Sequence, residues 1–239
     1  MKKFLRVLLY FGLVLFVFLL PFSVNYDENT FDKLIENTFP VIKEEVKNEE
    51  DLDYFQKKYQ NSDIVARVFV DGSSINEPVV QTKDNDFYLN HDLFKRKDNR
   101  GSAFLDYRVN LNSGKKLIFG HNSSTLEVPF KELEKYYEYD YFKKHQIIEL
   151  EWEERLEKYQ IFSVFIETSD WSYMKLKFDT EQLWFDHISK LKNNSFYDTG
   201  VDVVSTDEIL ILQTCSHHKD YKKYKKKYLL IVAKKIKEN

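Results

Sequence analysis

The sequence predicts a mostly β domain, an eight-stranded barrel with flanking helices, preceded by N-terminal helices and a membrane anchor. Three observations predict this class. Short runs of β-branched and aromatic residues with a period of two recur from Ile64 to the C-terminus. Only two segments between these runs have helical spacing. The first residues combine a basic start with a long apolar run.

The membrane anchor is predicted from residues 1–25. Three basic residues among the first six precede an apolar run from Val7 to Val24, which is close to the length that spans a bilayer. This predicts a single-pass protein of the cell membrane, with a cytoplasmic N-terminus and an extracellular domain. A cleaved signal peptide is one alternative, but the run lacks a clear small-x-small site and exceeds the usual apolar length. A buried core helix is another.

Residues 26–63 have the polar composition and spacing of a helical linker. Pro40 divides this segment into two predicted helices, of which the second lies near 49–59. Eight predicted strands then build the domain of residues 64–239, and this number suits a closed or nearly closed barrel. The strand segments are 64–72, 77–82, 101–108, 115–122, 146–154, 157–168, 208–215 and 227–236.

Two helical segments interrupt the strands. The first is 129–137, with Pro129 at its start. The second is 179–194, with Asp179 or Thr180 as its N-cap. Its apolar face should pack on the barrel and consists of Trp184, Ile188 and Leu191.

The composition excludes several classes of function. The formal charge of −3 results from many residues of both signs, so no strongly basic surface predicts a nucleic-acid partner. Glycine and proline are scarce, which is typical of a packed domain. No Gly-rich phosphate loop and no metal-type His/Cys spacing is present, so we expect neither a cofactor nor a metal.

Cys215 is the only cysteine, and it ends the apolar run "ILILQTC" just before the polar "SHHKDYKKYKKK". It has no internal disulfide partner and is therefore a free thiol. A lone cysteine is commonly a small buried hydrophobe. A thiol at the point where a strand leaves the core can instead meet a substrate. Such chemistry needs a thiolate, or a base that makes one, and imidazole is the usual partner.

His121 is the histidine best placed for that role. It ends a buried-type strand in "KKLIFGHN", where Gly120 lets the backbone turn tightly. His91, His145 and His187 lie in surface-type polar or helical contexts, in which a solvated or capping role is expected. From the residues alone, His121 is equally well explained as a hydrogen-bonding residue at a strand end.

The order of the motifs identifies a family. "YLNHDL", "GSAFLDYR", "LIFGHN" followed by "PFKELEKY", then "EKYQIFSVF", a helix and "LQTC" occur in this order. This arrangement resembles the sortases, and the helices before the barrel and before the cysteine strand resemble class B. The resemblance covers residues 64–236 and implies a membrane-anchored cysteine transpeptidase of Gram-positive bacteria with a sortase-type β-barrel.

The resemblance also implies a set of site residues. Cys215 would be the nucleophile and His121 the general acid/base. The third catalytic residue of the family is an arginine at the start of the last strand, but no arginine follows Arg155 in this chain. Lys227 is the first candidate for that position and Lys225 is the alternative, unless the lysines only form a solvated loop. The expected substrate-binding residues are Leu212, Thr214, Asn122 and Ser123.

The implied reaction cuts a C-terminal sorting signal resembling Asn-Pro-Gln-Thr-Asn after its threonine, through a thioacyl-enzyme. The surface protein is then joined to a peptidoglycan cross-bridge amine, or slowly hydrolysed when water replaces the amine. Haem-acquisition surface proteins are frequent substrates in the class. Two alternatives are a pilin-polymerising sortase and a catalytically impaired, membrane-tethered binding module.

Overall fold

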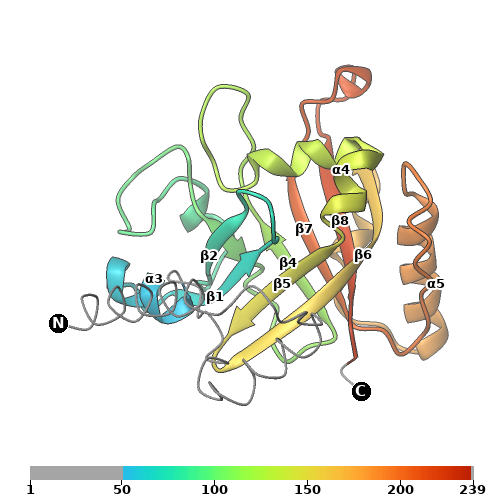
Figure 1. Cartoon of the computed structure of the whole chain (residues 1–239), viewed down its shortest axis with the longest axis horizontal. Helices are drawn as coiled ribbons and strands as arrows, with labels where there is room; N and C mark the ends of the chain where they lie inside the picture. The colour runs from blue at the N-terminus through green and yellow to red at the C-terminus, as the bar shows by residue number, and fades with distance from the viewer. Residues whose placement is uncertain (1–50, 238–239) are drawn as a thin grey trace, which may run out of the picture. The chain divides into compact units, whose positions relative to one another are not determined.

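The computed structural model describes residues 51–237, in which eight strands form a closed barrel (Figure 1). Around the barrel the strands follow the order β1-β2-β3-β4-β7-β8-β6-β5. Each predicted strand segment overlaps one observed strand, so the predicted eight-stranded barrel is confirmed. The strands are β1 (Ile64–Phe69), β2 (Asn76–Val80), β3 (Ala103–Leu105), β4 (Lys115–Phe119), β5 (Ile147–Trp152), β6 (Arg155–Glu167), β7 (Ile209–Cys215) and β8 (Tyr228–Lys235).

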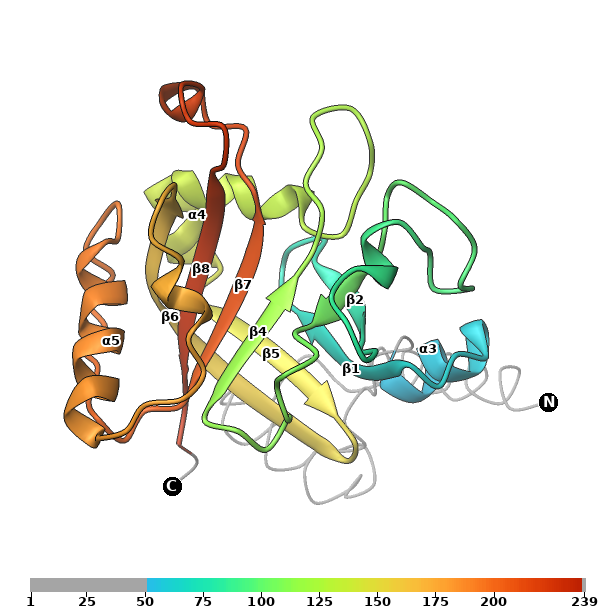
Figure 2. The same cartoon turned by 180° about the vertical axis from the view of Figure 1, so that it is seen from behind.

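Two of the strand pairs are parallel, β2 with β3 and β4 with β7, and the others are antiparallel. A parallel pair needs a long crossover connection. For β4 and β7, this crossover includes β5, β6 and the long helix before β7. Figure 2 shows β7 between β4 and β8. Because β4 and β7 run in the same direction, their carboxyl ends meet at one edge of the barrel.

The apolar run before Cys215 is explained by burial on both faces of β7. Leu210 and Leu212 belong to the interior cluster, whereas Ile209 and Ile211 belong to a second cluster on the outside of the sheet. A strand covered on both faces has a nearly continuous hydrophobic sequence instead of an alternating one. Strand β7 is therefore packed on both of its faces.

Two α-helices agree with the sequence-based expectations. Helix α3 (Leu52–Tyr59) lies in the second predicted linker helix and begins where the Asp51 side chain accepts from the Tyr54 N–H at 2.9 Å. Helix α5 (Glu181–Asn193) has Thr180 as its N-cap and buries Ile188 and Leu191. It contacts β6 on the outside of the barrel (Figure 1).

The remaining helices are short and bring one correction. The predicted helix at 129–137 is a 3₁₀-helix, η2 (Lys131–Tyr137), and it begins two residues after Pro129. The others were not predicted: η1 (Phe87–Leu89), α4 (Tyr139–Lys144), η3 (Trp171–Met174) and η4 (Lys219–Tyr221).

The predicted anchor, residues 1–25, and the first linker helix lie outside the described residues. Among residues 51–237, no helix has the length and hydrophobicity needed to cross a membrane. The division into 1–25, 26–63 and 64–239 stays a prediction. Asn48–Asn239 form one compact unit.

Candidate active site

The candidate site lies where the paired strands β4 and β7 end. Phe119 is opposite Gln213 in their parallel register. The two segments stay paired for one more residue. The Gly120 N–H donates to the Gln213 carbonyl at 3.1 Å, and the Thr214 hydroxyl donates to the Gly120 carbonyl at 2.7 Å. The next residue of each segment, His121 and Cys215, therefore lies at the same edge of the barrel.

A close approach around His121 requires two glycines. A Cβ at Gly120 would lie 2.6 Å from the ring of the fully buried Phe130. Gly101 has φ +60, and a Cβ there would lie 2.7 Å both from His121 Cδ2 and from the Tyr88 carbonyl. Neither contact leaves room for a side chain, so both positions depend on glycine.

The imidazole of His121 is oriented by the segment before Gly101. Its Nε2 lies 2.6 Å from the Leu89 carbonyl oxygen. A carbonyl oxygen only accepts, so Nε2 bears the proton in this contact and Nδ1 is left as the basic nitrogen of the neutral ring. The ring is half-buried, which leaves one side open to solvent.

Cys215 is exposed at the end of β7 and lies opposite Tyr228 in the register of β7 and β8. Partial burial raises the pKa of the Cys215 thiol, and the positive charge of Lys227 opposes this rise. Because burial is the larger effect, the neutral thiol predominates near pH 7. A base or a nearby cation must therefore help to form the thiolate.

The backbone N–H groups that follow Cys215 are already in use. The Ser216 N–H donates to the Lys227 carbonyl at 3.0 Å, and the His217 N–H donates to Glu134 Oε1 at 2.6 Å. The His218 N–H donates to Ser216 Oγ at 3.1 Å. None of these three donors is free to stabilise a negative charge developing beside the sulfur, which favours a side-chain donor there.

Lys227 is placed to supply that donor. It is half-buried, directly precedes β8, and its charge acts on the Cys215 thiol. Its ammonium donates to the Tyr224 carbonyl at 3.3 Å. Lys225 is exposed and is not among the groups that shift the thiol pKa. The position of Lys227 is thus the better match to the missing arginine, and the role of either lysine stays a prediction.

A family model of the sortase domain matches residues 68–236. This chain belongs to the sortase family. Sortase B of Listeria monocytogenes is 34% identical over 168 residues, which are 68% of this chain and 67% of the relative. Sortase B of Staphylococcus aureus is 32% identical over 180 residues, 74% and 72% of the two chains. The structure of Clostridium perfringens sortase B has a TM-score of 0.68 at 30% identity and covers 76% of this chain and 100% of that chain.

These similarities make the protein a class B sortase, a cysteine transpeptidase of the cell-wall anchoring kind. The eight-stranded sortase barrel predicted from the sequence agrees with the solved structures. The roles of the individual site residues stay predictions.

The four expected substrate-binding residues of this sortase occupy different positions. Leu212 and Thr214 are fully buried beneath the site, so they support its floor, and their contact with substrate stays a prediction. Asn122 is buried and its Nδ2 donates to the Cys215 carbonyl at 2.9 Å, while its Oδ1 has no partner among the described residues. Ser123 is half-buried and opens toward a neighbouring cavity.

Sequence reasoning missed Tyr173 and Tyr228. Burial and the nearby Cys215 raise the pKa of Tyr228, and Cys215 is also among the groups that act on Tyr173. The Tyr173 hydroxyl donates to Gln213 Oε1 at 2.8 Å, and the Trp171 ring lies 5.1 Å from the Tyr228 ring. Only the cross-strand register of β7 and β8 reveals Tyr228, because it lies 13 residues after the cysteine in the chain.

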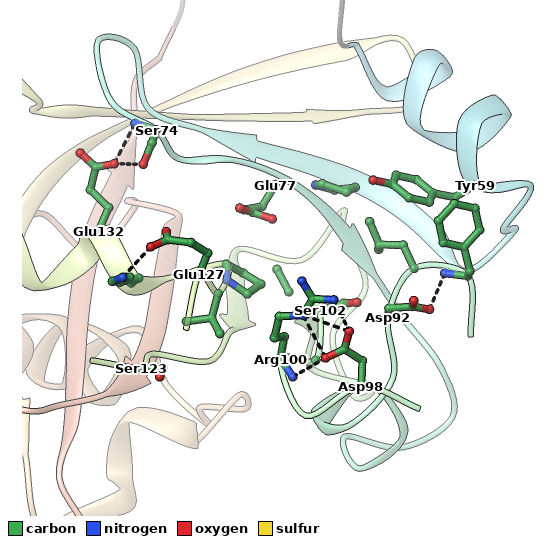
Figure 3. Close-up of a pocket in the computed structure, with 18 of the residues that line it drawn as sticks. Tyr59, Ser74, Glu77, Asp92, Asp98, Arg100, Ser102, Ser123, Glu127 and Glu132 are labelled. Carbon is green, nitrogen blue, oxygen red and sulfur yellow. Dashed lines mark hydrogen bonds and ion pairs between the residues drawn. The ribbon is translucent and has the colours of Figure 1, made fainter. Parts of the chain in front are cut away.

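A cavity of about 760 Å³ lies beside the site (Figure 3). Its walls come from β2, the loop before β3 and the loop before η2, and neither Cys215 nor His121 lines it. Figure 3 shows Glu77 in the cavity, between Glu132 and Ser102. Burial raises the pKa of Glu77 to about 8, and the structure gives its carboxyl group no hydrogen bond or ion pair among the described residues.

His187 corrects the expectation of a surface role. It is buried, and its Nε2 lies 2.8 Å from the ammonium of buried Lys115. Lys115 also donates to the carbonyls of Tyr173 and Lys175, at 2.6 and 2.8 Å. Burial lowers the pKa of His187 to about 3, so the neutral ring accepts from the lysine. The sequence could not reveal this contact, because His187 lies in a polar helix and Lys115 lies 72 residues away in sequence.

His145 fits the expected solvated or capping role, since it is the C-cap of α4. Nδ1 of His91 lies 2.7 Å from the Phe87 carbonyl, and the ring is half-buried. Within residues 51–237, no cluster of three or more histidine, cysteine or acidic side chains is arranged to hold a metal.

Proposed function

We propose that this sortase cuts a C-terminal sorting signal resembling Asn-Pro-Gln-Thr-Asn after its threonine and joins the surface protein to a peptidoglycan cross-bridge amine. The observation that best supports the chemistry is the parallel pairing of β4 and β7, which brings His121 and Cys215 to one edge of the barrel. The sorting signal and the acceptor follow from the class B resemblance.

The first half-reaction forms a thioester. Cys215 Sγ, as the thiolate, attacks the threonine carbonyl carbon, and the negative charge that develops on the carbonyl oxygen faces Lys227. His121, as the imidazolium, gives its proton to the leaving amide nitrogen. The carbon–nitrogen bond breaks, the C-terminal part of the signal leaves as an amine, and the rest stays bound through sulfur.

The second half-reaction reverses these roles. Neutral His121 takes a proton from the incoming amine, whose nitrogen attacks the thioester carbonyl. The carbon–sulfur bond then breaks and the thiolate is restored. The Leu89 carbonyl holds Nε2–H, which leaves Nδ1 to exchange this proton. Water in place of the amine gives slow hydrolysis.

The proposed location is the outer face of the cell membrane, with residues 1–25 as a single anchor and the N-terminus in the cytoplasm. The basic start and the length of the apolar run support this orientation. Protease added to intact cells should therefore digest the domain. A domain that stays intact until the cells are lysed would mean that the orientation is wrong.

A fragment of residues 48–239 is suitable for solution experiments. It comprises the compact unit. The solved C. perfringens sortase B chain is matched over its full length and corresponds to only 76% of the present chain. The fragment is incubated with a panel of quenched sorting peptides, with and without oligoglycine or a lysine-bearing pilin peptide as acceptor. Mass spectrometry identifies the products.

We expect cleavage after threonine and a new amide bond to oligoglycine, both absent from Cys215→Ala. Transfer only to the pilin peptide would replace wall anchoring with pilin polymerisation. A fragment that binds peptides but cuts none, and whose Cys215 is not labelled selectively by a thiol probe, would support the impaired binding module, for which the missing arginine is the motivating observation.

A further inference from the structure

The loop between β7 and β8 is strongly basic in a chain whose formal charge is −3. We call residues 219–227 the lysine loop. It contains a single acidic residue, Asp220, and six lysines: Lys219, Lys222, Lys223, Lys225, Lys226 and Lys227. Figures 1 and 2 show that this loop projects beyond the end of the barrel. It begins four residues after Cys215.

The positive charges of the lysine loop are not neutralised within the described part of the chain. None of the six ammonium groups forms an ion pair there, and Asp220 faces His218 at 3.9 Å. All the lysines except Lys227 are exposed. Like charges held so close together repel, and an anionic partner would remove that repulsion.

Aromatic side chains lie beneath these lysines. Trp171 is 40% exposed, Phe196 is 39% exposed and Tyr224 is 38% exposed. The Tyr221 ring lies 6.1 Å from Tyr224 and 6.3 Å from Phe196. Tyrosine and tryptophan, with an apolar body and a polar tip, are favoured at the boundary between water and lipid.

The lysines extend over these rings without forming a closed pocket. The Lys223 ammonium lies 5.1 Å from the Tyr224 ring centre, and that of Lys226 lies 5.3 Å from the Trp171 ring centre. A projecting surface of flexible point charges suits many phosphates spread over a plane. A single bound anion would need convergent donors, and arginine forks are better suited to that task.

We propose that the lysine loop docks on the anionic phospholipid head groups of a membrane surface, with its five exposed lysines on the phosphates and with Tyr221, Tyr224 and Trp171 at the interface. Docking sets the edge of the barrel that contains Cys215 toward the bilayer. This goes beyond the proposed function, because docking requires no catalysis and its test replaces Lys219, Lys222 and Lys223, to which the reaction assigns no role.

The test is co-sedimentation of the 48–239 fragment with vesicles. We expect binding to vesicles of phosphatidylcholine with phosphatidylglycerol, no binding to phosphatidylcholine alone, and release in about 1 M salt, where charges are screened beyond roughly 3 Å. Replacing Lys219, Lys222 and Lys223 together by glutamine should weaken binding on the order of 100-fold, since each surface lysine strengthens it several-fold.

The matched control replaces three exposed lysines elsewhere, Lys58, Lys83 and Lys97, by glutamine and removes the same net charge. It should bind vesicles as the parent fragment does. Both triple variants should cut peptides in solution at the parent rate, which shows that they are folded and separates this proposal from the proposed function.

Three results would overturn the proposal. The first is no binding to phosphatidylglycerol vesicles. The second is an equal loss in both triple variants, which would make net charge the cause. The third is binding to soluble polyphosphate that is as tight as binding to vesicles and equally dependent on the loop, which would assign the loop to a wall polyanion.

Discussion

Lys227→Ala should lower kcat/KM for peptide cleavage by about 100- to 1000-fold, the typical cost of losing one oxyanion donor. The structure leaves few substitutes, because the N–H groups of Ser216 and His217 are both engaged. Lys227 is also the only cation whose charge is found to act on the Cys215 thiol within the described residues.

The same substitution has a second, independent consequence. The charge of Lys227 lowers the pKa of the Cys215 thiol, so its removal should raise that pKa. The midpoint of the pH dependence of iodoacetamide alkylation should therefore move to higher pH in Lys227→Ala. It should stay unchanged in Lys225→Ala, whose lysine is exposed and does not affect the thiol.

The kinetic assay uses the 48–239 fragment, a quenched sorting peptide and four variants. Lys225→Ala and Lys226→Ala should each change kcat/KM only slightly. Lys227→Arg should keep or raise activity, because the guanidinium restores the planar donor fork used by the family. Equal, small losses for the three alanine variants would refute the reasoning and leave the lysines as a solvated loop.

Three further predictions concern the surroundings of the site. Gly101→Ala forces a side chain at φ +60 into His121 and the Tyr88 carbonyl, so denaturant unfolding should show a loss of about 1–3 kcal/mol and kcat should fall; parent-like values would contradict the packing. The Glu77 pKa is raised from 4.5 to about 8, so the free energy of unfolding falls as pH rises through that range. Glu77→Gln should therefore be more stable than the parent at pH 8 by about 1 kcal/mol or more, and the difference should disappear near pH 4.5. A difference that stays constant across pH would contradict this. Lys115→Met leaves the Tyr173 and Lys175 carbonyls without their donor. The free energy of unfolding should fall by about 2–4 kcal/mol, and KM should rise as η3 shifts beside Cys215. An unchanged melting temperature would contradict this role.

The fold was largely predictable because strand periodicity is a local signal. All eight strands and α5 with its Thr180 cap follow from short runs of β-branched and aromatic residues and from capping residues that lie within a few positions of one another. The parallel pairing of β4 with β7 does not, because it joins segments more than 90 residues apart through a crossover. The motif order supplied that information through the family resemblance.

The site was predictable only in part, for the same reason. Cys215 and His121 stand at strand ends, which sequence shows. The orientation of His121 by the Leu89 carbonyl, the position of Tyr228 opposite Cys215 and the burial of His187 on Lys115 all depend on contacts between distant segments. The sequence also could not show that Leu212, an expected substrate-binding residue, is fully buried in the barrel interior.

The central claim is that Cys215 forms a thioester with the threonine of a sorting signal. Intact-mass spectrometry of the 48–239 fragment, mixed with a sorting peptide and quenched in acid within seconds, tests it directly. We predict an added mass equal to the peptide up to its threonine, located on Cys215, removed by hydroxylamine and absent from Cys215→Ala. Peptide cleavage without such an adduct, or an adduct that persists in Cys215→Ala, would contradict the account.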